Sequence, residues 1–102
     1  MTELQKTYLP MTETMFYILL SLRTPRHGYG VLLHVRKITD GRIELSAGTI
    51  YNSLSRLERD GMITLHNEAD RRKTYKIQAP GRAVLRAEQQ RLEELLRNAR
   101  DL

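Results

Sequence analysis

The sequence predicts a mainly α-helical fold with one small β-hairpin and a long C-terminal helix. Three observations support this fold class. Apolar residues recur at helical spacing in three segments before residue 62. Two short runs within residues 63–77 alternate apolar and polar residues, as half-buried strands do. Leucines recur at heptad-like intervals after residue 82. With 102 residues, the chain is expected to form one compact unit.

The first two predicted helices lie between residues 10 and 41. Residues 1–9 are a mostly polar lead, expected either to fray or to pack on a neighbour. Pro10 is well placed to begin a helix, and residues 14–22 are apolar on nearly all sides, which indicates burial of more than one face. The breaker cluster RTPRHG ends this helix. A second helix begins near Gly28 or Tyr29 and closes at Asp40 and Gly41, and residues 42–45 are predicted to be a short extended piece.

The third predicted helix has a polar face of an unusual kind. Ser46 is a good N-cap, Ile50, Leu54 and Leu57 form one apolar stripe, and Gly61 ends the helix. The polar face is formed by Thr49, Asn52, Ser53 and Arg56. Hydroxyl, amide and guanidinium groups are those that reach base edges and phosphates in a DNA major groove. The simpler alternative is a core helix with small polar residues outside.

The rest of the chain predicts a hairpin and a long helix. Residues 63–68 and 72–77 are predicted strands joined by residues 69–71, with Asp70, Arg71, Arg72 and Lys73 at the tip. Pro80 and Gly81 are expected to break the chain before one helix over residues 82–102. The heptad-like seam of that helix consists of Leu85, Leu92, Leu95, Ala99 and Leu102.

Composition narrows the class of function. Lysine and arginine number 17 against 12 acidic residues, a formal net charge of +5, which favours an anionic partner. The absence of cysteine excludes disulfides and thiolate metal sites. No secretory signal is visible, and the apolar run of residues 15–22 is too short to span a bilayer. We therefore expect a soluble, cytoplasmic protein that does not bind membranes.

Catalytic and metal-binding patterns are not found. His27, His34 and His66 lack the spacing of a metal site, and the acidic residues show no pairing for acid–base catalysis. There is no glycine elbow around a serine and no phosphate-binding glycine loop. The prediction is a protein that is not an enzyme and has no cofactor or metal.

Three helices followed by a hairpin with a basic tip is the layout of a winged helix-turn-helix, whose third helix enters the major groove. Several segments resemble the PadR-type transcriptional regulators in order and spacing: YILLSL at 17–22, HGYG at 27–30, GTIYNSLSRLERDGMI at 48–63, RRKTYKI at 71–77 and PGR at 80–82. The resemblance covers residues 14–82. The chain is most similar to the short subclass with a single C-terminal helix.

The resemblance implies a homodimeric repressor that binds double-stranded DNA at an inverted-repeat operator. Residues 1–80 would be the DNA-binding domain and residues 81–102 the dimerisation helix, with the seam leucines and Ala99 at the contact. Some members of the subclass bind aromatic or drug-like compounds near the dimer centre, so a small-molecule effector is possible, of a class that the sequence does not specify.

The resemblance also implies a role for each residue of the DNA-binding site. The residues expected at DNA are Tyr29, Ser46, Gly48, Thr49, Tyr51, Asn52, Ser53, Arg56, Arg71, Arg72 and Lys73. Two positions have alternatives: Tyr51 either contacts the DNA backbone or packs inward against Tyr29, and Tyr29 either contacts a phosphate or packs. The wing cations would hold phosphates.

Two other classes of function remain open from the sequence. One is a winged-helix module that binds another protein, because this fold hosts many functions. The other is a small RNA-binding domain, against which stands the lack of aromatic residues clustered on one strand face. Steep salt dependence of duplex binding distinguishes DNA recognition from the protein-binding module. A gel shift with duplex DNA against single-stranded RNA distinguishes it from the RNA-binding domain.

Overall fold

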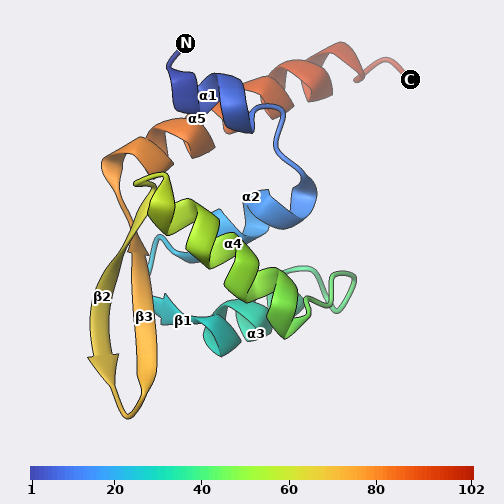
Figure 1. The fold of residues 1–102 in the computed structure, drawn as a ribbon. Coiled ribbons are helices and arrows are strands. Elements are labelled where there is room, and N and C mark those ends of the chain that lie inside the picture. Colours follow the sequence, from blue (N-terminus) through green and yellow to red (C-terminus); the bar gives the residue numbers. More distant parts are fainter.

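The computed structural model describes all 102 residues. The elements in chain order are α1 (Glu3–Tyr8), α2 (Glu13–Ser21), β1 (Arg26–His27), α3 (Gly28–Ile38), α4 (Ala47–Arg59), β2 (Ile63–Ala69), β3 (Arg72–Ile77) and α5 (Ala79–Asn98). Helices α2, α3 and α4 pack together, the β2–β3 hairpin projects from one side, and α1 lies along α5 (Figure 1). This arrangement confirms the predicted fold class of a winged helix-turn-helix with a long C-terminal helix.

One apolar core holds these elements together. It takes side chains from all five helices, from both long strands and from the linkers, namely Tyr8, Met11, Ile18, Leu19, Leu22, Val31, Val35, Ile50, Leu54, Leu57, Met62, Ile63, Ile77, Val84 and Leu85. Helix α2 buries adjacent residues Ile18 and Leu19 completely, which confirms that more than one of its faces is covered. None of the helices combines the length and the apolar composition needed to cross a membrane.

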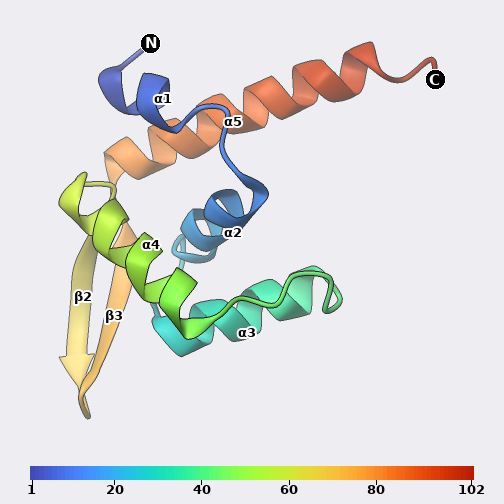
Figure 2. The same ribbon diagram turned by 45° about the vertical axis from the view of Figure 1, so that its right-hand side comes forward.

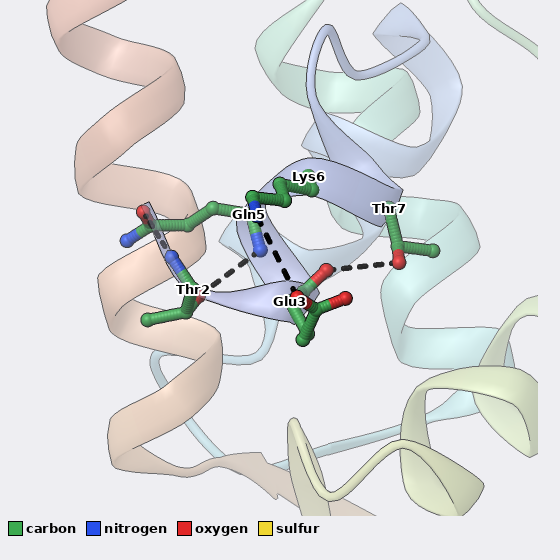
Figure 3. A network of polar contacts seen from close by, with 5 residues as sticks. All are labelled: Thr2, Glu3, Gln5, Lys6 and Thr7. Carbon is green, nitrogen blue, oxygen red and sulfur yellow. Dashed lines mark hydrogen bonds and ion pairs between the residues drawn. The ribbon is translucent and has the colours of Figure 1, made fainter.

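Helix α1 was not predicted, because a six-residue helix is too short to be stable on its own. A capping box closes its start: the Gln5 amide donates to the Thr2 hydroxyl (3.1 Å), and the Thr2 amide donates to Gln5 Oε1 (3.2 Å). The Thr7 hydroxyl donates to the Glu3 carbonyl, and Lys6 pairs with Glu3 (Figure 3). Burial of Tyr8 in the core then fixes the helix to the rest of the fold.

Two boundaries of the first half differ from the prediction. Pro10 does not begin α2, since the helix begins at Glu13 with Thr12 as its N-cap, the hydroxyl accepting from the Met15 amide. Residues 42–45 form no strand, so the predicted extended piece does not join the sheet. The third strand is instead β1, inside the segment predicted only as a helix breaker.

The sheet is antiparallel with strand order β1-β3-β2. His27 of β1 is opposite Thr74, and Ile63 of β2 is opposite Ile77. Asp70 and Arg71 form the two-residue turn, with φ of 51° and 64°, the geometry that matches the twist of a tight hairpin. The turn is therefore one residue shorter than predicted, because Ala69 belongs to β2, whereas β3 covers Arg72–Ile77 as predicted.

Helix α5 begins at Ala79 rather than Arg82, so Pro80 and Gly81 lie in its first turn instead of breaking the chain. Pro is compatible with this position because first-turn amides have no partner within the helix. Gly81 is buried beneath the loop that follows α4: a Cβ there would lie 2.5 Å from the Met62 carbonyl oxygen and 2.8 Å from Ile77 Cγ1.

Gly81→Ala is accordingly expected to destabilise the protein by about 3 kcal/mol, the upper range for overpacking, because one close atom belongs to backbone. Urea unfolding followed by circular dichroism measures the effect. Gly48→Ala is the matched control, since its added Cβ meets nothing closer than 4.0 Å and alanine is the better helix former. Equal loss of stability in the two variants would contradict the close approach at Gly81.

Candidate nucleic-acid interface

Helix α4 is built as the sequence predicts. The Ser46 hydroxyl accepts from the Thr49 amide at 3.1 Å, and Gly61 follows the helix with φ of 73°. Ile50, Leu54 and Leu57 are 1%, 3% and 0% exposed. Because the apolar stripe is fully covered, the orientation of the remaining side chains of α4 is fixed with respect to solvent.

The part of α4 farthest from the core is a ridge formed by Gly48, Asn52, Ser55 and Arg59. At about 100° per residue, these positions lie roughly 140–180° from Ile50, and all are exposed. Ser55 and Arg59 were missed in the sequence prediction. Measuring angles from the centre of the apolar stripe would have found both of them.

The predicted polar face lies to one side of this ridge. Thr49 is exposed, and its hydroxyl accepts a hydrogen bond from Ser46 Oγ at 3.0 Å, while Ser53 is half-buried. Asn52 alone belongs to both the predicted face and the observed ridge. Thr49, Ser53 and Arg56 thus border the ridge on the side away from the hairpin.

Arg56 has a partner within the fold. Its guanidinium carbon lies 4.5 Å from the centroid of the Tyr8 ring, a cation–π distance. The Tyr8 hydroxyl donates to Asp60 Oδ2 at 2.7 Å. Burial and this hydrogen bond raise the pKa of Tyr8 to about 12, so the hydroxyl remains a donor at neutral pH. Helix α1 therefore contacts the C-terminal end of α4 through Arg56 and Asp60.

The hairpin tip adds positive charge beside α4. Arg71, Arg72 and Lys73 are exposed, and none of them belongs to any of the four ion pairs in the structure. We call these three residues the wing cations. Unpaired cations on an exposed hairpin are free to bind an anionic partner.

A groove of about 520 Å³ connects the wing cations to α4 and to the start of α3. It is lined by His27, Gly28, Tyr29, Tyr51, Arg71, Arg72, Lys73 and Tyr75, with no acidic residue among them. Tyr29 and Tyr51 are 58% and 61% exposed. Both rings are therefore accessible from solvent, and both also line a small pocket of about 60 Å³ with Gly28, Leu32, Ala47 and Ile50, so DNA contact and packing stay alternatives for Tyr29 and Tyr51.

The seam of α5 is divided between the core and solvent. Leu85 is 8% exposed and lies in the chain's own core, whereas Leu92 and Leu95 are 41% and 50% exposed. Leu96, which the sequence prediction omitted, is 62% exposed. Ala99 is the C-cap of α5, and Leu102 lies beyond the helix. We call Leu92, Leu95 and Leu96 the exposed leucine stripe.

Buried Glu88 fixes the first half of α5. It is 2% exposed, accepts from the Met11 amide at 3.2 Å, and accepts two hydrogen bonds from Arg91 at 2.6 and 2.8 Å. The C-terminal end of α5 extends away from the other helices, and the C-terminus lies far from the core (Figure 2). The exposed leucine stripe thus continues the buried face of α5 into solvent.

Comparison with known proteins agrees with this geometry. The model of the transcriptional regulator PadR-like family matches residues 17–87. No curated protein sequence gives a significant match.

Solved structures of transcriptional regulators have the same fold. The chain is similar to one from Clostridium thermocellum, with a TM-score of 0.74, 21% identity, and coverage of 100% of this chain and 96% of that chain. A PadR family regulator from Eggerthella lenta has a TM-score of 0.67 and 26% identity, with coverage of 97% of this chain and 84% of that chain. Bacillus subtilis PadR in complex with operator DNA has a TM-score of 0.64 and 21% identity, with coverage of 74% of this chain and 47% of that chain.

Proposed function

Because the chain belongs to the PadR-like family of transcriptional regulators, we propose that it is a homodimeric repressor that binds an inverted-repeat operator. The family consists of transcriptional regulators and not of enzymes. The observation that carries the proposal is the groove in which α4, the start of α3 and three unpaired wing cations meet without an acidic residue. Such a surface suits the sugar-phosphate backbone beside a major groove.

In this proposal α4 lies in the major groove with its exposed ridge toward the bases. Asn52 and Arg59 are the two side chains able to make bidentate contacts, amides preferring adenine and guanidinium groups preferring guanine. Ser55 adds a hydroxyl between them. Ser46 and Gly48 lie at the positive N-terminal end of the helix, where phosphates bind well. Thr49 and Ser53 would follow the groove wall.

The wing cations would contact the DNA backbone together with the hydroxyls of Tyr29 and Tyr51. The same backbone contacts form on any sequence, so they supply affinity and register rather than sequence preference. Bacillus subtilis PadR, which has a similar fold, was solved in complex with operator DNA, which supports DNA as the partner in this proposal.

The homodimer would form through α5. Residues 1–80 act as the DNA-binding part and residues 81–102 as the dimerisation helix, although Val84 and Leu85 also complete the core. A second copy that covers the exposed leucine stripe would place two α4 helices on one duplex. Their half-sites are expected about 34–36 Å apart, one helical turn.

Fluorescence anisotropy with the duplex upstream of the reading frame tests the proposed function. Operator DNA is expected to bind with a Kd of about 10⁻⁸ M or lower, at least about 10³-fold more tightly than a scrambled duplex. Affinity should fall steeply with salt. Equal binding to both duplexes, or stronger binding to single-stranded RNA, would overturn the proposal.

The variants Arg59→Ala and Arg56→Ala are expected to change DNA binding in different ways. Arg59→Ala should cost about 1–3 kcal/mol of operator binding and relax preference at one base pair, because Arg59 lies on the ridge. Arg56→Ala removes a side chain already held against Tyr8, so any loss should be similar on operator and scrambled duplexes. Base preference is measured by selecting the operator variants that each protein binds. A broader base preference in the Arg56→Ala variant would assign the base contact to Arg56 instead of Arg59.

A further inference from the structure

Both ring nitrogens of His27 face groups that can only donate hydrogen bonds. The Gly30 amide donates to Nδ1 at 3.0 Å, which makes His27 the N-cap of α3. Nε2 lies 3.3 Å from Nη1 of Arg72. A neutral imidazole has one donor and one acceptor nitrogen, and a guanidinium has no acceptor. Both contacts therefore cannot be hydrogen bonds at the same time.

The hydrogen bond that caps α3 determines which of the two contacts of His27 is unsatisfied. With Nδ1 accepting from Gly30, the ring proton is on Nε2, and an N–H faces the Arg72 guanidinium. The opposite tautomer would satisfy Arg72 but would place an N–H against the Gly30 amide and remove the cap of α3. An imidazolium would donate from both nitrogens. Every protonation state leaves two donors facing each other, and an anionic oxygen acceptor between them would resolve the conflict.

The fold holds these two donors together. His27 is opposite Thr74 in the β1–β3 ladder, which places Arg72 at the diagonal position on the same face, within reach of a long side chain. Both residues line the groove beside α4, with Arg71 and Lys73. The positive end of α3, an 11-residue helix, begins at the same point. The charged side chains that line the groove, together with this helix end, therefore favour an anion.

We infer that His27 and Arg72 together bind one backbone phosphate of the DNA, with Nε2–H and the guanidinium as donors. This inference rests on the proposed function and adds to it a contact from β1, an element outside both α4 and the hairpin. His27 then has two tasks, since the nitrogen that caps α3 also fixes the proton on the nitrogen that faces DNA. The contact is independent of base sequence because its target is a phosphate.

His27→Asn separates these two tasks. The shorter Asn side chain still accepts from the Gly30 amide, being a favoured N-cap, but it does not extend to the position of Nε2. The variant is expected to bind both operator and scrambled duplex about tenfold more weakly, the effect of removing one hydrogen bond to a charged group. Thermal unfolding by circular dichroism checks that the cap is retained.

Neutral methylphosphonates placed one at a time in the operator backbone identify the phosphate. One position should weaken binding by the wild type about tenfold or more and weaken binding by His27→Asn several-fold less, because one of the two donors to that phosphate is already absent. Arg72→Gln should show a reduced effect at the same position, which tests the pairing even if His27→Asn unfolds, and the double variant should show none. The inference is overturned if no single position loses part of its effect in both variants, or if different positions do so in the two variants.

His34→Asn is the matched control, because His34 is a histidine of α3 whose ring also contacts an arginine. Its Nδ1 lies 3.2 Å from Arg26 Nη2, and burial, followed by the charge of Arg26, lowers the pKa of His34. That contact has one donor and one acceptor, so it needs no anion, and the variant should keep every methylphosphonate effect of the wild type. A reduced effect at the same position in His34→Asn would also count against the inference. Failure of the wild type to bind any duplex would instead reject the proposed function.

Discussion

Replacing Leu92 and Leu95 by glutamate is expected to convert the protein to monomers and to weaken operator binding by about 10²–10⁴-fold, the usual gain from joining two binding units. Both side chains lie on the exposed leucine stripe, half in solvent in the single chain. Burying them against a second copy would stabilise a dimer through the hydrophobic effect. A carboxylate in the same place must be desolvated without a partner, which opposes association.

Sedimentation equilibrium measures the mass, and anisotropy on full and half operators measures the binding. The monomer should bind a half-site and a full operator with similar weak affinity. Because the substitutions also remove positive net charge, a control with the same charge change is needed. Gln90→Glu with Arg97→Gln supplies it, since both residues are exposed and lie at least about 100° around the helix from each leucine of the stripe.

Two outcomes would contradict the predicted role of the exposed leucine stripe. A Leu92→Glu, Leu95→Glu variant that remains dimeric would place the dimer contact outside the exposed leucine stripe. Monomers that still bind the full operator as tightly as the wild type would show that pairing through α5 does not contribute to DNA binding. Because Leu92 and Leu95 are outside the core, the helix content measured by circular dichroism should be retained in the variant.

The sequence predicts α4 well because its signals are local. Ser46, the stripe of Ile50, Leu54 and Leu57, and Gly61 each act within one helix, and the structure confirms all of them. The hairpin was predicted for the same reason, since alternation over residues 63–77 is a local pattern. Both elements carry most of the candidate site.

The features that sequence reasoning missed depend on contacts between distant segments. Tyr8 contacts Asp60, 52 positions away, and this contact explains both the existence of α1 and the position of Arg56. Strand β1 is only two residues long and forms because β3 is beside it. A pattern within one segment does not predict such pairings, because neither segment alone carries a sign of its partner.

Burial also changed the interpretation of α5. A heptad-like seam indicates an apolar face but does not tell which chain covers it, and the structure assigns Leu85 to the chain's own core. Glu88 lies in a stretch with charged residues of both signs, yet it is buried and accepts a hydrogen bond from the Met11 amide. The exposed stripe that remains for a partner therefore begins one turn after Glu88, with Leu92.

The wing cations are expected to set the salt dependence of DNA binding. Changing Arg71, Arg72 and Lys73 to glutamine should lower the slope of log Kd against log salt by about 3, close to 0.9 for each phosphate that is no longer neutralised. The physical reason is counterion release: each cation that neutralises a phosphate frees a condensed ion from the duplex. The preference for operator over scrambled DNA should change little, because base contacts come from α4.

A control with equal charge separates local contact from net charge. Changing Lys37, Arg86 and Arg100 to glutamine removes three charges from a chain of formal net charge +5, leaving 5 − 3 = +2, as in the wing variant. These residues are exposed, unpaired and away from the groove. Long-range attraction is screened beyond about 8–10 Å, so the control should retain most of the slope. If the slope falls equally in both variants, the hairpin does not touch DNA, and the positive charge of the whole molecule, rather than the wing, accounts for its attraction to the duplex.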